Sequence, residues 1–143
     1  MVDRPDLAAM MHPLVRALMA AEEPVLEAHG LTMWGYTVLL ALDGNPTRTQ
    51  AALAERIGAD KTRIIPTLDK LEADGFIDRY PDPDDRRVHL LALTEHGGEV
   101  KDATQEAIQT GEERWLVDLS DSDREVFLRV LHELARMAER WPE

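Results

Sequence analysis

The residues of this sequence best suited to chemistry are three adjacent charged side chains, Asp85, Arg86 and Arg87. They follow a proline-containing turn, and an arginine on such a loop can enter the minor groove of DNA, where negative potential is focused. Asp85 would lie on the same side as Arg87 and could hold its guanidinium extended through a bidentate pair. Arg86 could contact a phosphate or nothing. The alternative is a solvent-exposed ion pair of little energetic consequence, so the choice depends on the surrounding elements.

Two short helices are predicted before this loop. Thr49 can cap a helix that ends at Ile57, and a second helix is predicted over 61–74, after a turn at 58–60. Alternating residues then predict the two strands of a hairpin, namely Ile77 and Arg79, followed by Val88, Leu90 and Ala92. A helix, a turn, a helix and a wing are the arrangement that places one helix in a DNA groove and a loop in the next.

Polar residues at the starts of the two helices are candidate DNA contacts. Lys61, Thr62 and Arg63 fall in the predicted first turn of the second helix, where backbone amides and side chains can meet phosphates or base edges. Arg48 and Thr49 lie at the start of the first helix and are candidates for contacts with DNA phosphates. The alternative is an ordinary solvated helix face.

A proline complicates the second helix. Pro66 would lie in its interior and remove one backbone donor, so we expect a local kink there. Thr67 and Lys70 lie on the outward face beyond it and are further candidates for DNA contact, or surface residues without that role.

Long amphipathic helices are predicted on both sides of this segment. Residues 6–28 form the first, which Pro13 and Pro24 should kink or interrupt. From Glu95 one long helix follows, and Ser120 caps a second. Their apolar stripes exceed what the central segment needs for its own burial, so a homodimer is predicted. The alternative is that the C-terminal helices pack on each other within one chain.

The charge distribution permits binding to DNA. The net charge is −12, but residues 47–94 hold eight Lys or Arg against nine Asp or Glu, a balance of −1. The acidity therefore lies outside the candidate DNA-binding segment, where it would repel DNA and help to fix the orientation of binding.

Several functional classes are excluded by composition. The chain has no cysteine, which excludes disulfides, thiolate metal sites and thiol redox sensing. The five histidines form no close-spaced pair, and no nucleophile, phosphate-loop or paired-carboxylate motif is present, so we expect no metal, no cofactor and no enzyme. The sequence shows no secretory signal and no membrane-spanning run, which predicts a cytoplasmic protein with no membrane partner.

Several segments together resemble the MarR family of transcriptional regulators. They are Gly30 to Thr32, Thr49 to Gly58, Asp60 to Thr62, Leu71 to Gly75 and, most specifically, Asp85 to Gly97. The resemblance covers about Leu14 to Trp141. It implies a mainly α fold with a small β-hairpin, in which a winged helix-turn-helix core carries N- and C-terminal dimerisation helices. The single domain, 1–143, would comprise a DNA-binding lobe at 31–97 and dimerisation helices at 6–29 and 98–141.

The resemblance also implies a homodimer on a palindromic operator and a small aromatic or phenolic effector. His12, Arg16, Trp34 and Tyr36 fall where ligand pockets form in that family, and an aromatic ring beside a cation would suit a carboxylate or phenolate. The alternative is core packing for Trp34 and Tyr36 and a surface position for the other two. Pro66 and Thr67 depart from the family pattern, so base specificity does not transfer.

Two functions from different classes remain. The first is a sequence-specific DNA-binding regulator, a homodimeric repressor released by a small aromatic ligand. The second is a winged-helix module that binds a protein and not DNA, for which the acidic charge would be natural. Because phosphate contacts release counterions, the salt dependence of duplex binding separates the two.

Overall fold

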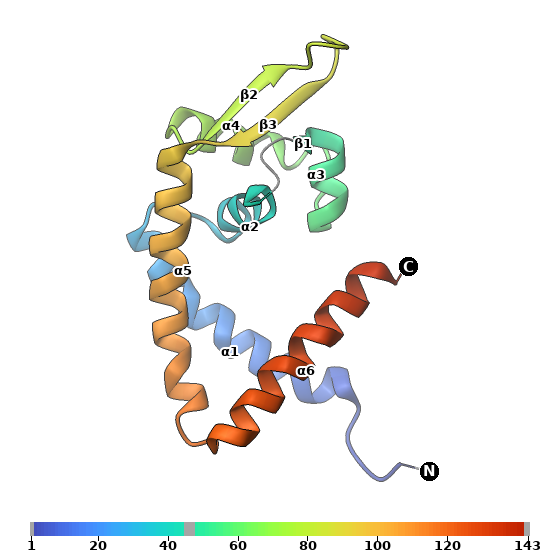
Figure 1. Cartoon of the computed structure of the whole chain (residues 1–143), viewed down its shortest axis with the longest axis vertical. Helices are drawn as coiled ribbons and strands as arrows, with labels where there is room; N and C mark the ends of the chain where they lie inside the picture. The colour runs from blue at the N-terminus through green and yellow to red at the C-terminus, as the bar shows by residue number, and fades with distance from the viewer. Residues whose placement is uncertain (1, 45–47, 142–143) are drawn as a thin grey trace. The chain divides into compact units, whose positions relative to one another are not determined.

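The computed structural model describes residues 2–44 and 48–141. Its elements, in chain order, are α1 (Leu7–Ala28), α2 (Met33–Leu42), β1 (Arg48–Thr49), α3 (Gln50–Ile57), α4 (Ile65–Ala73), β2 (Ile77–Pro81), β3 (His89–Leu93), α5 (Glu95–Leu116) and α6 (Asp121–Arg140) (Figure 1). The chain forms two compact units, Met1–Ile108 and Gln109–Glu143. The predicted mainly α fold with a small hairpin is confirmed.

Local signals define the helix-turn-helix. The Thr49 hydroxyl accepts a hydrogen bond from the Ala52 amide at 3.1 Å and so caps α3 as predicted. Gly58 ends that helix in the left-handed conformation, with φ of 71°, which glycine adopts without steric cost. The Asp60 carboxylate then accepts from the amides of Thr62 and Arg63, at 2.8 and 3.2 Å, and orders the turn before α4.

The predicted extent of the second helix is wrong at its start. The helix begins at Ile65 and not at Lys61, so residues 61–63 lie in the preceding turn. Pro66 therefore lies in the first turn of α4 and not in its interior. Amides of a first helical turn have no partner within the helix, so the missing proline N–H breaks no bond and the reason for a kink disappears.

The core of the first unit lies between the helix-turn-helix and the sheet. Leu39 of α2, Leu53 of α3, Leu68 of α4 and Leu91 of β3 are fully buried. The predicted strand alternation selected Leu90 and Ala92, whereas Leu91 between them is the buried residue of β3. The order β1-β3-β2 includes the short strand β1, which the sequence did not predict, and both pairings are antiparallel.

The long helices of the first unit are continuous. Helix α1 runs unbroken through Pro13 and Pro24, so the interruption considered above does not occur. The first turn of α5 lies against the backbone of Phe76, where a Cβ on Gly97 would approach the Phe76 carbonyl oxygen to 1.9 Å. Only glycine fits this contact.

The second unit contains the end of α5 and all of α6. The Ser120 hydroxyl accepts from the Asp123 amide at 3.1 Å and caps α6, as predicted. Arg124 and Glu113 form a bidentate pair with both distances 2.6 Å. No residue of α6 is buried in this chain, and its exposed apolar residues include Val126, Phe127, Val130, Leu131, Leu134 and Met137.

Within the described residues, no single helix is long and apolar enough to span a membrane; α1 and α2, bent by 84° at their junction, pass the same test of length and composition only as a pair.

Candidate nucleic-acid interface

The wing, defined as β2, β3 and the loop 82–88 between them, carries the predicted arginine–carboxylate pair. The Arg87 guanidinium donates from Nε to Asp85 Oδ1 at 3.1 Å and from a terminal nitrogen to Oδ2 at 3.3 Å. The Arg87 amide also donates to Oδ1 at 3.1 Å. These bonds lower the pKa of Asp85, chiefly through the Arg87 side chain. The predicted bidentate contact is confirmed.

The Arg87 side chain remains available to a ligand despite this pair. It is 90% exposed, and Arg86 beside it is also exposed. The loop is ordered by local bonds, from the Asp82 amide to the Val88 carbonyl at 2.8 Å and from the Val88 amide to the Asp85 carbonyl at 2.9 Å. A pre-ordered loop with an outward guanidinium suits a narrow, negatively charged groove.

The turn between α3 and α4 presents the second group of candidates. Lys61, Thr62 and Arg63 are all exposed. Asp60 fixes the backbone of this turn and also accepts from the Thr62 hydroxyl at 2.6 Å, and the Thr62 side-chain bond is the largest cause of the lowered pKa of Asp60. Thr62 therefore serves the turn itself, which leaves Lys61 and Arg63 as the outward cations.

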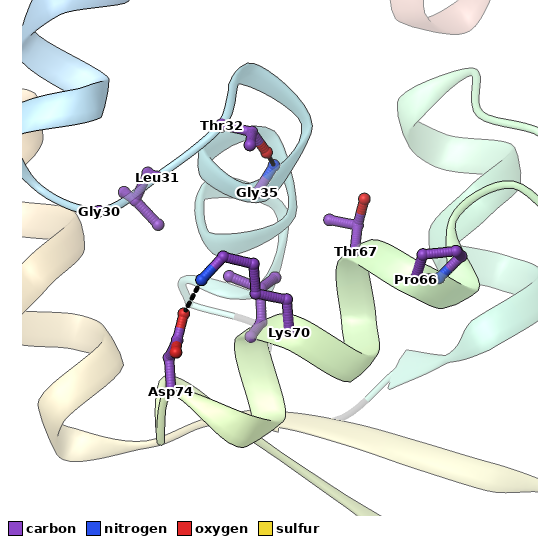
Figure 2. Close-up of a pocket in the computed structure, with 9 residues that line it drawn as sticks. Gly30, Leu31, Thr32, Gly35, Pro66, Thr67, Lys70 and Asp74 are labelled. Carbon is purple, nitrogen blue, oxygen red and sulfur yellow. Dashed lines mark hydrogen bonds and ion pairs between the residues drawn. The ribbon is translucent and has the colours of Figure 1, made fainter.

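The remaining predicted contacts occupy different environments. The Arg48 backbone pairs with Leu91, and its side chain lies outside the described part of the structure. Thr49 is half-buried, and its hydroxyl caps α3. Thr67 and Lys70 lie on the side of α4 that faces the start of α2, and Lys70 pairs with Asp74 at 2.7 Å (Figure 2).

These α4 residues line a small hollow of about 180 Å³ together with Leu31, Thr32 and Gly35 (Figure 2). The Thr32 hydroxyl is engaged there as the acceptor from the Gly35 amide at 3.0 Å. Lys70 lines this hollow while its ammonium pairs with a carboxylate.

The four predicted ligand residues are not gathered at one place. Arg16 lines a hollow of about 600 Å³ with Leu26, Leu31 and Met33, whereas Trp34 lines another of about 340 Å³ with Arg63 and Thr67. Tyr36 is buried in the core, and His12 is exposed on α1. The structure thus brings Arg16 and Trp34 to separate hollows.

Sequence reasoning missed two internally bound cations. Arg79 was predicted only as a strand residue, but its side chain is 18% exposed and contacts Asp69 and Glu72 of α4. Lys101 of α5 is 5% exposed and pairs with Asp43 at 2.8 Å and Asp102 at 2.5 Å. For Arg79 a signal existed, because two-residue alternation places it on the same strand face as the buried Ile77.

No group of three or more metal-ligating side chains occurs among residues 2–44 and 48–141. The sites that the geometry does provide are a charged wing tip and a cationic turn on a helix-turn-helix scaffold.

Known proteins share this architecture. The sequence pattern of the MarR family matches residues 29–88. The crystal structure of MarR aligns with a TM-score of 0.85 and 28% identity over 98% of this chain and 95% of that one. The chain belongs to the MarR family.

Other members extend the comparison. The HTH-type transcriptional regulator YybA of Bacillus subtilis is 27% identical over 94% of this chain and 90% of its own length. The repressor CouR, bound to a 23-mer DNA duplex, has a TM-score of 0.76 and 28% identity over 91% of this chain and 92% of its own. CouR from Rhodococcus jostii has also been solved with p-coumaroyl-CoA, at 25% identity, a TM-score of 0.73 and the same two coverages. These relatives are regulators rather than enzymes, and DNA binding and transcription regulation are the functions this MarR-family chain shares with them.

Proposed function

We propose that this MarR-family chain is a homodimeric repressor that binds a palindromic operator and is released by a small aromatic ligand. The observation that carries the proposal is the Asp85–Arg87 pair on the wing that directly follows the helix-turn-helix. In this proposal Arg87 enters a minor groove, and Lys61 and Arg63 meet the backbone or base edges of the adjacent major groove. Arg48, Thr49, Thr62, Thr67, Lys70 and Arg86 complete the proposed DNA-facing set.

Exposed apolar surface supports the dimer. Helix α6 buries nothing in this chain, and Leu7, Met10, Met11, Leu14 and Val15 of α1 are each about two-fifths exposed or more. Apolar stripes of this length are uncommon on monomers and are covered in symmetric dimers. We assign 6–29 and 98–141 to dimerisation and 31–97 to the DNA-binding lobe, within a single domain, 1–143.

The ligand part of the proposal is supported by the CouR complex with p-coumaroyl-CoA and by the hollow beside Arg16. Arg16 would meet an anionic group there. A ligand in that hollow would shift the spacing of the two recognition helices, which must lie roughly 34 Å apart to enter successive major grooves. Operator affinity would then fall without any contact between ligand and DNA.

Binding to duplex DNA as a function of salt tests the proposal. With about 6–10 phosphate contacts in the dimer, log affinity should fall against log salt with a slope of roughly −5 to −9. The operator is first selected from random duplexes, and the mass of the free protein is measured by light scattering. A slope near zero would overturn DNA binding in favour of a protein partner, and a monomer at micromolar concentration would overturn the dimer.

A further inference from the structure

Arg79 connects three elements of the DNA-binding lobe. From β2, its guanidinium donates to Asp69 and, at 3.2 Å, to Glu72 of α4, while the other terminal nitrogen lies 3.5 Å from the side-chain oxygen Oε1 of Gln50 at the start of α3. Its backbone amide also donates to Glu72, at 3.2 Å. The wing, the proposed recognition helix α4 and the preceding helix α3 therefore all contact one side chain.

The charges around Arg79 make this arrangement unusual for a DNA-binding surface. Helix α4 is the element that must approach a polyanion, yet Asp69 and Glu72 leave 58% and 41% of their side chains exposed. Lys70 is the only cation within α4, and it pairs with Asp74. Neutralisation of Asp69 and Glu72 therefore comes from the wing through Arg79.

We propose that Arg79 is a positioning residue for DNA binding, which fixes the wing relative to α4 and compensates the two α4 carboxylates without touching DNA. The inference rests on the proposed DNA-binding function and adds a residue to its machinery. The guanidinium is suited to the task because its planar fork serves several acceptors at once in a fixed geometry.

The electrostatics agree with this role. Partial burial acts to lower the pKa of Arg79, but hydrogen bonds with Glu72 and Asp69 outweigh it and the net pKa is raised. The guanidinium is therefore charged at neutral pH. The guanidinium groups of Arg79 and Arg87 both face carboxylates, but the Arg79 side chain is only 18% exposed whereas that of Arg87 is 90% exposed, so Arg79 is less able to reach a phosphate.

Operator affinity across a salt series gives the first test. Arg79→Gln should weaken binding roughly tenfold per subunit, the scale of one charge-assisted hydrogen bond, with no change in salt slope. A phosphate-contacting arginine would instead reduce the slope by about 1. Arg86→Gln is the matched comparison, since it removes the same charge from the same wing; because Arg86 is exposed and belongs to the proposed DNA-facing set, its loss should reduce the slope by about 1.

The carboxylates supply a test of sign. Asp69→Asn removes a negative charge from the helix that approaches DNA, so simple electrostatics predicts tighter binding. Our proposal predicts weaker binding for Asp69→Asn and for Glu72→Gln, and no further loss when Glu72→Gln is combined with Arg79→Gln, because one network is already broken.

A distance measurement separates positioning from general stability. The chain has no cysteine, so Ala73→Cys on α4 and Asp84→Cys at the wing tip take two specific spin labels. The distance distribution between them should broaden in Arg79→Gln while circular dichroism shows an intact fold. Two results would overturn the proposal. One is that Arg79→Gln binds the operator more weakly, with a reduced salt slope and an unchanged distance distribution; the other is that its operator affinity is unchanged. The label positions used are ones at which the labelled parent still binds the operator of the unlabelled parent. If neither parent binds any duplex, the proposed DNA-binding function fails, and not the positioning role of Arg79.

Discussion

The helix-turn-helix lobe and helix α6 handle apolar side chains in opposite ways. In the lobe, Leu39, Leu53 and Leu68 are completely buried within a single chain. In α6, every large apolar residue keeps at least 38% of its surface exposed, from Val130 and Leu131 to Trp141 just beyond the helix. The lobe has a buried core of its own, whereas no residue of α6 is buried.

This difference separates two kinds of information in one sequence. Buried side chains in the lobe stabilise the fold of a single chain, whereas the exposed apolar stripe on α6 is available for the dimer proposed above. Substitutions in the two regions should therefore have different signatures, one in stability and the other in assembly.

The largest expected effect is on assembly. Leu131→Glu combined with Leu134→Glu would place four carboxylates in the proposed dimer interface, which should weaken it by more than about 4 kcal/mol, or about a thousandfold. Light scattering at micromolar concentration should report half the parent mass. His132→Glu lies on the opposite face of the same helix by helical spacing and should leave the mass unchanged. A dimeric double variant would show that α6 is not the interface.

Next in size is a core substitution in the lobe. Leu39→Ala should lower the free energy of unfolding by about 2–5 kcal/mol, because it leaves a cavity at a fully buried position. Leu40→Ala, at the neighbouring position with 38% of its surface exposed, should cost far less. Denaturant unfolding measures both. Equal losses would contradict the sharp boundary between core and surface in α2.

Wing substitutions should reduce DNA binding and leave both stability and assembly intact. Arg87→Ala should cost about 1–3 kcal/mol per subunit in operator binding, most on operators with A·T-rich flanks. Asp85→Ala should weaken binding too, since it releases the guanidinium. Asp84→Ala removes the same charge one residue away and is the control. Tighter binding by Asp85→Ala would show that the carboxylate does not position Arg87.

The smallest effect concerns Lys101, the buried ammonium on α5. The hydrogen bonds that its ammonium donates to Asp102 and Asp43 raise its pKa, so its contribution to stability is complete below the ordinary lysine pKa of about 10.4 and is lost as pH rises through the raised value. Lys101→Met, which keeps the packing, should change the free energy of unfolding by about 1 kcal/mol or less at pH 7 and flatten its decline at alkaline pH. Unfolding measured between pH 7 and pH 11 compares the two proteins, and parallel curves would exclude a contribution from the ion pairs.

Local patterns in the sequence predicted those features that depend on residues close together along the chain, namely the helix caps and the charged pair at the wing tip. The capping residues Thr49 and Ser120 and the pair of Asp85 with Arg87 act over two or three positions, so the chain carries their geometry in its spacing. The order of helix, turn, helix and wing could be predicted for the same reason.

Contacts between distant residues were decided by the tertiary structure. Arg79 is bound by carboxylates seven and ten positions away and Lys101 by one 58 positions away. Strand alternation could place Arg79 on the same face as Ile77, but no local pattern identified the partners of either cation. The start of α4 depended on the turn that Asp60 orders. Because of that turn, Pro66 lies in the first turn of the helix, where a backbone amide has no acceptor within the helix. The sequence by itself determined the order of the helices and the wing, and which charges lie at the wing tip. Only the folded chain decided which cations are held in ion pairs with distant residues, because those contacts depend on proximity in space and not along the chain.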